Sequence, residues 1–117
     1  MSYLALFRAE AYRDKYEAPP GELDAVRRWR DDLQARGMEL VGQPLRPAQE
    51  GATVRIRDGE VLRTDGPFAE TKEVVGGFEV LDCATLDEAV ELVSRFPAAA
   101  YGCVELREII PINWAAH

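Results

Sequence analysis

Histidine is almost absent from this sequence, since the single histidine is the last residue, His117. Cysteine occurs twice, as Cys83 and Cys103, in separate strand-like runs that lack metal-ligand spacing. Two buried, reduced thiols are the simpler interpretation of such a pair. The chain also offers no Ser-His-Asp set, no Cys-His pair and no phosphate-binding loop. We therefore predict no metal site and no cofactor, and any chemistry must rest on Asp, Glu, Arg, Lys or Tyr side chains.

Long apolar runs and an excess of positive charge are also missing. The 14 Lys and Arg residues stand against 21 Asp and Glu residues, which gives a net charge of −7. An acidic chain repels polyphosphate, so nucleic acid and anionic membrane surfaces are not expected partners. The longest apolar runs, such as Tyr3–Phe7, fall far short of the ~20 residues that span a bilayer. The N-terminal stretch MSYLALFRAE has no secretory-signal pattern, and we expect a cytoplasmic protein.

What is present indicates one globular domain. The chain has 117 residues, of which 47% are hydrophobic and 30% charged, so one modest core can form. We assign residues 1–117 to a single domain with a C-terminal tail from about residue 110 to residue 117. Because this tail carries Ile110, Ile112 and Trp114, we expect it to pack on the body or on a partner subunit.

Two helices are predicted from periodicity and end signals. Leu23, Val26, Trp29 and Leu33 recur at helical spacing through Arg36, and Gly37 follows as the C-cap. The charged run 27–32 on this helix is interpreted as an exposed face with i,i+4 ion pairs. Thr85-Leu86-Asp87-Glu88 is a capping box that begins the second helix, which Pro97 ends.

Strands are predicted at residues 3–7, 38–41, 78–83 and 103–109, with a hairpin over residues 53–64. The hairpin turns at Asp58-Gly59, a pair suited to a type I′ turn because both central residues need positive φ. The order of elements is β, α, β, hairpin, β, α, β. This order predicts an α+β fold of ferredoxin-like βαββαβ plan with an inserted β-hairpin.

The first strand is apolar on both faces, since Tyr3, Ala5 and Phe7 alternate with Leu4 and Leu6. Both helices should pack on one face of the sheet, which leaves the second face to be covered by something else. A second copy of the chain is the simplest candidate, so we expect a homodimer.

One stretch carries a family likeness. Residues 64–73, TDGPFAETKE, with Gly76-Gly77-Phe78 and the closing segment 104–107, resemble the DGPF proteins of the YCII-related family. The resemblance implies a dimeric α/β barrel, in which two sheets face each other around a cavity. It also implies a small-molecule-binding or accessory module, with a possible link to sigma-factor regulation. The histidine of the His and Asp pair proposed for the family does not carry over, because Arg30 stands about where related proteins place it.

Asp65 matches the DGPF aspartate, and its first expected role is to lock a turn before Gly66-Pro67 by accepting backbone N–H bonds. The functional alternative is a cofactor-independent lyase or isomerase in which Asp65 is the catalytic acid or base and Arg63 or Arg107 steadies an oxyanion. Arg63 is expected to pair with Asp65 or to hold a small anionic ligand. Glu105 and Arg107 are expected on the cavity face, where they pair or line a polar pocket. Glu70 and Lys72 are interpreted as a solvated pair and Phe68 as a core or dimer contact.

Overall fold

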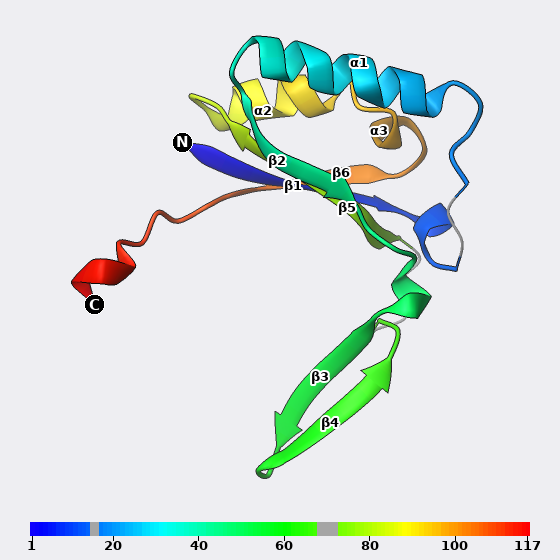
Figure 1. The fold of residues 1–117 in the computed structure, drawn as a ribbon, viewed down its shortest axis with the longest axis vertical. Helices are drawn as coiled ribbons and strands as arrows, with labels where there is room; N and C mark the ends of the chain where they lie inside the picture. The colour runs from blue at the N-terminus through cyan, green and yellow to red at the C-terminus, as the bar shows by residue number, and fades with distance from the viewer. Residues whose placement is uncertain (15–16, 68–72) are drawn as a thin grey trace.

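The computed structural model describes residues 1–14, 17–67 and 73–117, which form two antiparallel sheets, a layer of helices and short 3-10 turns (Figure 1). The strands are β1 Ser2–Ala9, β2 Glu39–Pro44, β3 Ala52–Arg57, β4 Glu60–Asp65, β5 Val74–Asp82 and β6 Cys103–Glu108. The helices are α1 Glu22–Ala35, α2 Leu86–Val93 and α3 Ala98–Tyr101, and the 3-10 turns are η1 Glu10–Tyr12, η2 Ala48–Glu50 and η3 Trp114–Ala116.

The main sheet has the strand order β2-β5-β1-β6, and every neighbouring pair is antiparallel. This order, with α1 and α2 in the two long connections, is compatible with the ferredoxin-like plan and confirms the α+β class. Two strands are longer than predicted, because β2 continues to Pro44 and β5 begins at Val74. The Gly76-Gly77 pair therefore lies inside a strand, where Leu45 N–H donates to Gly76 O at 2.8 Å.

Both long helices cover one face of this sheet, as predicted (Figure 1). In β1 the buried residues alternate with half-buried ones, and Tyr3, Ala5 and Phe7 face the helices. Leu33 of α1 and Leu81 of β5 are the largest fully buried side chains and lie between the two layers. The core of the domain is thus the space between the helices and one sheet face.

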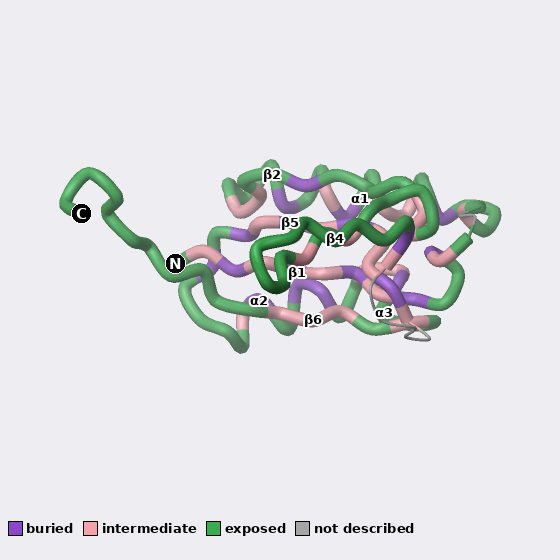
Figure 2. Tube along the Cα trace, turned by 90° about the horizontal axis from the view of Figure 1, so that it is seen from below, coloured by how far each residue is buried: buried purple, intermediate pink, exposed green. Residues whose placement is uncertain are grey.

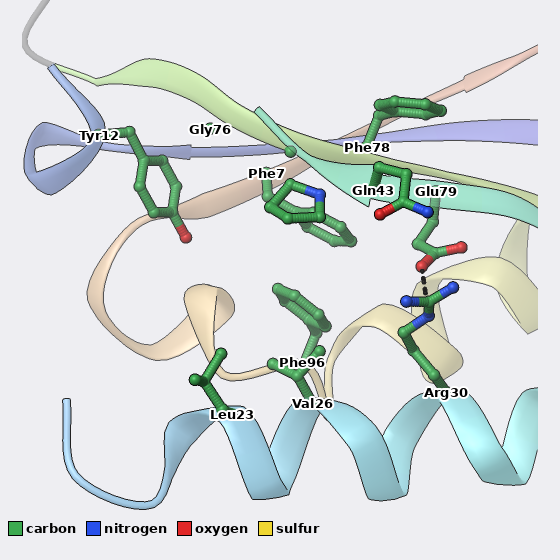
Figure 3. A pocket seen from close by; sticks show the side chains of 12 residues that line it. Phe7, Tyr12, Leu23, Val26, Arg30, Gln43, Gly76, Phe78, Glu79 and Phe96 are labelled. Atoms are coloured by element: carbon green, nitrogen blue, oxygen red, sulfur yellow. Dashed lines mark ion pairs between the residues drawn. The ribbon is translucent and has the colours of Figure 1, made fainter. Parts of the chain in front are cut away.

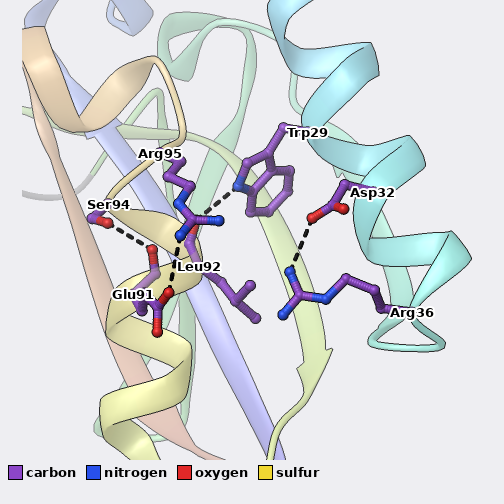
Figure 4. Close-up of polar contacts among 7 residues, drawn as sticks. All are labelled: Trp29, Asp32, Arg36, Glu91, Leu92, Ser94 and Arg95. Carbon is purple, nitrogen blue, oxygen red and sulfur yellow. Dashed lines mark hydrogen bonds and ion pairs between the residues drawn. The ribbon is translucent and has the colours of Figure 1, made fainter.

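One buried hydrogen bond joins the two helices. Trp29 Nε1–H of α1 donates to Leu92 O of α2 at 2.8 Å (Figure 4). We expect Trp29→Phe to lower the free energy of unfolding by about 0.5–1.5 kcal/mol, because the substitution removes this buried hydrogen bond while Leu92 O still accepts from Arg95 N–H at 3.4 Å. Asp32→Asn on the same helix breaks only the exposed ion pair with Arg36 and is expected to cost under ~0.5 kcal/mol. Urea unfolding of both variants checks this, and equal losses would contradict it.

One half of the predicted capping box of α2 is present, since Thr85 Oγ1 accepts from Glu88 N–H at 3.1 Å. The Glu88 carboxylate accepts from Ala84 N–H at 3.2 Å. α2 ends at Val93, which is earlier than predicted. Pro97 does not end α2 directly, because it lies at the start of the next helix, α3. No helix in the described part of the chain is long and apolar enough to cross a membrane.

The inserted hairpin projects from the body as a separate two-stranded sheet of β3 and β4 (Figure 1). The predicted turn is confirmed, since Asp58 and Gly59 have φ values of 52° and 78°. The two strands pair in the register of a two-residue turn, with Ile56 opposite Val61. All of β4 is exposed (Figure 2). The Cα radius of gyration is 16.2 Å, against about 13 Å for a compact domain of this size, and the hairpin accounts for part of the difference.

The C-terminal tail also leaves the body (Figures 1 and 2). Ile109 N–H still donates to Ser2 O at 2.8 Å, but the chain then passes the end of β1. Ile110 and Trp114 are 77% and 75% exposed. The prediction that the tail packs on the body is therefore wrong, because the sheet ends before the tail begins. Its packing on a partner subunit stays a prediction.

Candidate functional site

A mostly apolar cavity of about 110 Å³ lies between α1 and β5 (Figure 3). Its walls come from the helical layer and from the helix-facing side of the sheet, so it is an extension of the space that holds the core. The lining residues are Phe7, Tyr12, Leu23, Val26, Arg30, Gln43, Pro44, Gly76, Gly77, Phe78, Glu79 and Phe96. Among them, Glu79 and Arg30 are the charged pair.

Glu79 reaches this cavity because of strand alternation in β5. Gly77 and Leu81 share its face, and all three point from the sheet toward the helices. The Glu79 side chain is only 4% exposed. It lies directly over Gly42 of β2, where a Cβ atom would overlap the Glu79 carboxyl group. A glycine at position 42 is therefore required for this placement.

Arg30 of α1 connects Glu79 to a second carboxylate, Glu39 of β2. Arg30 Nε lies 3.3 Å from Glu79 Oε1 and 2.9 Å from Glu39 Oε2. Arg30 Nη2 donates to Glu39 Oε1 at 3.3 Å, and Gln34 Nε2 donates to the same oxygen at 2.8 Å. The guanidinium thus makes a bidentate contact with Glu39 through Nε and Nη2, and a longer contact with Glu79 through Nε. Its Nη1 takes part in neither contact.

The two carboxyl groups have opposite pKa changes. Burial, followed by the charge of Glu39, raises the pKa of Glu79 to about 7, and the opposing effect of Arg30 is smaller. Hydrogen bonding from Arg30 lowers the pKa of Glu39. Glu79 Oε2 has no hydrogen-bond partner in the described part of the chain. A proton on Glu79 lets it share a hydrogen bond with Glu39, and the cluster of two carboxyls and one guanidinium is then neutral.

The other end of the cavity has a phenol. The Tyr12 ring lies against Gly76, where a Cβ atom would overlap it. Its hydroxyl lies 3.0 Å from the Tyr101 hydroxyl, which donates to Glu22 Oε1 at 2.7 Å. Burial is the main cause of the raised pKa of Tyr12. The cavity therefore has polar groups at two ends and an aromatic middle.

Asp65 and Arg63 lie elsewhere, on β4 near the base of the projecting hairpin, at the opposite end from the Asp58-Gly59 turn. The predicted ion pair is present, with Arg63 Nη2 3.4 Å from Asp65 Oδ1. The side chains are 70% and 84% exposed, and neither lines the cavity. The adjoining turn is fastened by backbone groups, since Gly66 N–H donates to Gly51 O at 2.7 Å. A catalytic role for Asp65 and ligand binding by Arg63 stay predictions.

Glu105 and Arg107 lie on the sheet face that carries no helix. Their strand neighbours Val104 and Leu106 pack against the core, as predicted. Glu105 stands opposite Leu6 and Arg107 opposite Leu4 in the β1–β6 register. Arg8 Nη1 lies 3.3 Å from Glu105 Oε1, so the partner of Glu105 is on β1. A ligand-binding role for Glu105 and Arg107 stays a prediction, and Phe68, Glu70 and Lys72 lie outside the described residues.

Sequence reasoning missed the cluster of Arg30, Glu39 and Glu79. One signal could have indicated Glu79, because a carboxylate occupies a helix-facing position in the otherwise apolar run around residue 79. Arg30 was interpreted as part of an exposed helix face. Within residues 1–14, 17–67 and 73–117, no group of three or more His, Cys, Asp or Glu side chains could hold a metal ion.

Comparison with known proteins shows which family the chain belongs to. A stretch of 65 residues is 53% identical to an uncharacterized protein of Rhizobium meliloti (strain 1021), covering 54% of this chain and 52% of that protein. The chain thus spans about half the length of the curated relative that it matches. The model of the YCII-related domain matches residues 1–113. The chain therefore belongs to the YCII-related family.

Proposed function

We propose that this protein is a small-molecule-binding module and that its ligand occupies the cavity between α1 and β5. The observation that carries the proposal is Glu79, a buried carboxyl group with a raised pKa at the wall of an apolar cavity beside Arg30. Carboxyl groups of this kind cost stability when ionised, and they concentrate at sites that bind or transform ligands.

The proposed module acts as a homodimer. Leu4 and Leu6 of β1 and Phe78 and Val80 of β5 lie on the sheet face opposite the helices, in one register. These side chains form an apolar strip with no helix over it, a surface that a second copy of the chain would cover. In such a dimer the two sheets would face each other and enclose a space next to Glu105 and Arg107. This arrangement is the proposed dimeric α/β barrel.

The Asp65-based lyase or isomerase is a second candidate, supported by the Arg63–Asp65 ion pair. It requires a partner subunit to enclose Asp65, which is open to solvent in the single chain. A role next to sigma factors stays a prediction from family resemblance alone.

The cavity proposal is tested with a glycine substitution. We expect Gly42→Ala to displace the Glu79 carboxyl group and to abolish the thermal stabilisation that a ligand from a metabolite library gives to the unmodified protein. A ligand at one hundred times its Kd contributes about 2.7 kcal/mol, a shift of several degrees in Tm.

Gly51→Ala is the matched control, because a Cβ atom there would make only an ordinary contact with Ala48 O. Circular dichroism checks that both variants are folded. Retention of the full ligand response by a folded Gly42→Ala protein would contradict the proposed place of binding.

A further inference from the structure

The size of the cavity limits the ligand. The cavity is partly open to solvent, and its inner space of about 110 Å³ is somewhat smaller than the roughly 150 Å³ apolar cavity that binds benzene in an engineered protein. A single small ring or a short chain fills it. A larger ligand can place only one such group inside.

The walls favour a ring. Phe7 of β1 and Phe96, which follows α2, stack with their centroids 3.9 Å apart, and both line the cavity. Val26 of α1 lies beside Phe96 on the helix side of the cavity (Figure 3). These groups offer dispersion contacts to an apolar body and no hydrogen bonds.

The charges favour a neutral ligand. The charged groups that act on Glu79 are Arg30 of α1 and Glu39 of β2, and the polar group beside them is the Gln43 amide of β2. A carboxylate ligand would add a further anion next to a guanidinium that already pairs with Glu39. An ammonium ligand would add a cation next to Arg30. A carbonyl oxygen adds no charge and can accept a hydrogen bond from Arg30 Nη1, which neither carboxylate uses.

We propose, resting on the small-molecule function above, that the cavity binds a small neutral cyclic ketone and that Glu79 removes a proton from the carbon next to its carbonyl group. The C–H bond breaks and an O–H bond forms on Glu79. The electron pair of the C–H bond moves into the enolate, whose oxygen accepts a hydrogen bond from Arg30. Return of the proton to carbon regenerates the carboxylate, so the step needs no oxidant, reductant or second substrate.

The site is suited to this step because its total charge does not change. One negative charge lies on Glu79 before the transfer and on the enolate after it, and Arg30 is beside both positions. A buried carboxylate is also a stronger base than an exposed one. Glu79 is then a catalytic residue, and Arg30 stabilises the developing oxyanion.

The binding part is tested with three ring-matched probes: cyclohexanone, cyclohexylammonium and cyclohexanecarboxylate. In amide NMR spectra at pH 6 we expect cyclohexanone to shift the Gly76 and Gly77 resonances, with a Kd at least tenfold below that of either charged probe. Preference for a charged probe would overturn the ligand class. If a library ligand binds in this cavity but cyclohexanone does not, the proposed function stands and this inference fails.

The proton-transfer part is tested by deuterium exchange at the carbons next to the carbonyl of cyclohexanone in D₂O. We expect exchange to rise with pH and to level off above about 7 as Glu79 ionises. Glu79→Gln should lower the exchange about 10²–10⁴-fold when it is measured with the protein saturated with cyclohexanone. Glu91→Gln, which changes an exposed carboxylate on α2, is the control and should leave the exchange unchanged. Unchanged exchange in a folded Glu79→Gln protein that still binds the ketone would overturn the role of Glu79.

Discussion

Replacing Glu79 with glutamine is expected to raise the free energy of unfolding at pH 8 and to leave it almost unchanged near pH 4.5. The folded-state pKa of Glu79 is about 7 against an ordinary value of 4.5. Between these pH values the folded chain holds a proton that the unfolded chain has lost, so stability falls as pH rises through this window. Each pKa unit corresponds to about 1.4 kcal/mol, which gives a gain of roughly 3 kcal/mol for the variant above pH 7.

The variant is expected to gain stability because glutamine differs from glutamate in charge and hardly in size. Glutamine keeps the volume of the side chain and the contact with Arg30, and it removes the charge that burial disfavours. Urea unfolding from pH 5 to pH 8 measures the trend. Glu91→Gln removes an exposed partner of Arg95 and should show no such pH dependence. A Glu79→Gln protein that is less stable at pH 8 would mean that pairing with Arg30 outweighs burial and that the folded chain keeps Glu79 ionised.

Leu6→Asp is expected to dissociate the proposed homodimer. Leu6 lies in the middle of the sheet face without helices, opposite Phe78 on one side and Glu105 on the other. If a second copy covers this face, the new carboxylate is buried near Glu105 without a partner, at a cost of several kcal/mol. The symmetry of a dimer places the substitution at the interface twice. We expect the dimer to weaken at least a hundredfold.

Light scattering coupled to size-exclusion chromatography measures this directly. Leu86→Asp is the matched control, because Leu86 is half exposed at the first turn of α2, in the helical layer on the other side of the sheet. It should keep the mass of a dimer. An unmodified protein with the mass of one chain, or a Leu6→Asp protein with the mass of two, would rule out an interface on this face.

The elements that were predicted correctly from the sequence are those determined by residues close together in the chain. Asp58-Gly59 sets its own turn, and Thr85 with Glu88 sets the start of α2, so a short window holds the full physical cause. The α+β class followed from the order of the elements. The strand limits at Val74 and Pro44 did not, because pairing between β2 and β5 carries glycine and proline into strands that local preference excludes.

The site depends on residues that are far apart in the chain. Arg30, Glu39 and Glu79 come from α1, β2 and β5, and only the packing of α1 on the sheet brings them together. From spacing alone Arg27 and Asp31 or Arg28 and Asp32 were the natural pairs. In the folded chain Asp32 instead pairs with Arg36, and Arg30 turns inward to Glu39. A charged helix face cannot be divided into inner and outer residues before the facing strand is known.

The close approach of the Glu79 carboxyl group to Gly42 links two positions on adjacent strands. A side chain at position 42 and a long acidic one at position 79 exclude each other, so the two residues must change together. In other members of the family, a residue larger than glycine at the position of Gly42 should accompany a short side chain, or one turned elsewhere, at the position of Glu79. The glycine, which has no functional group, is thus the residue to look for when tracing where this acid occurs.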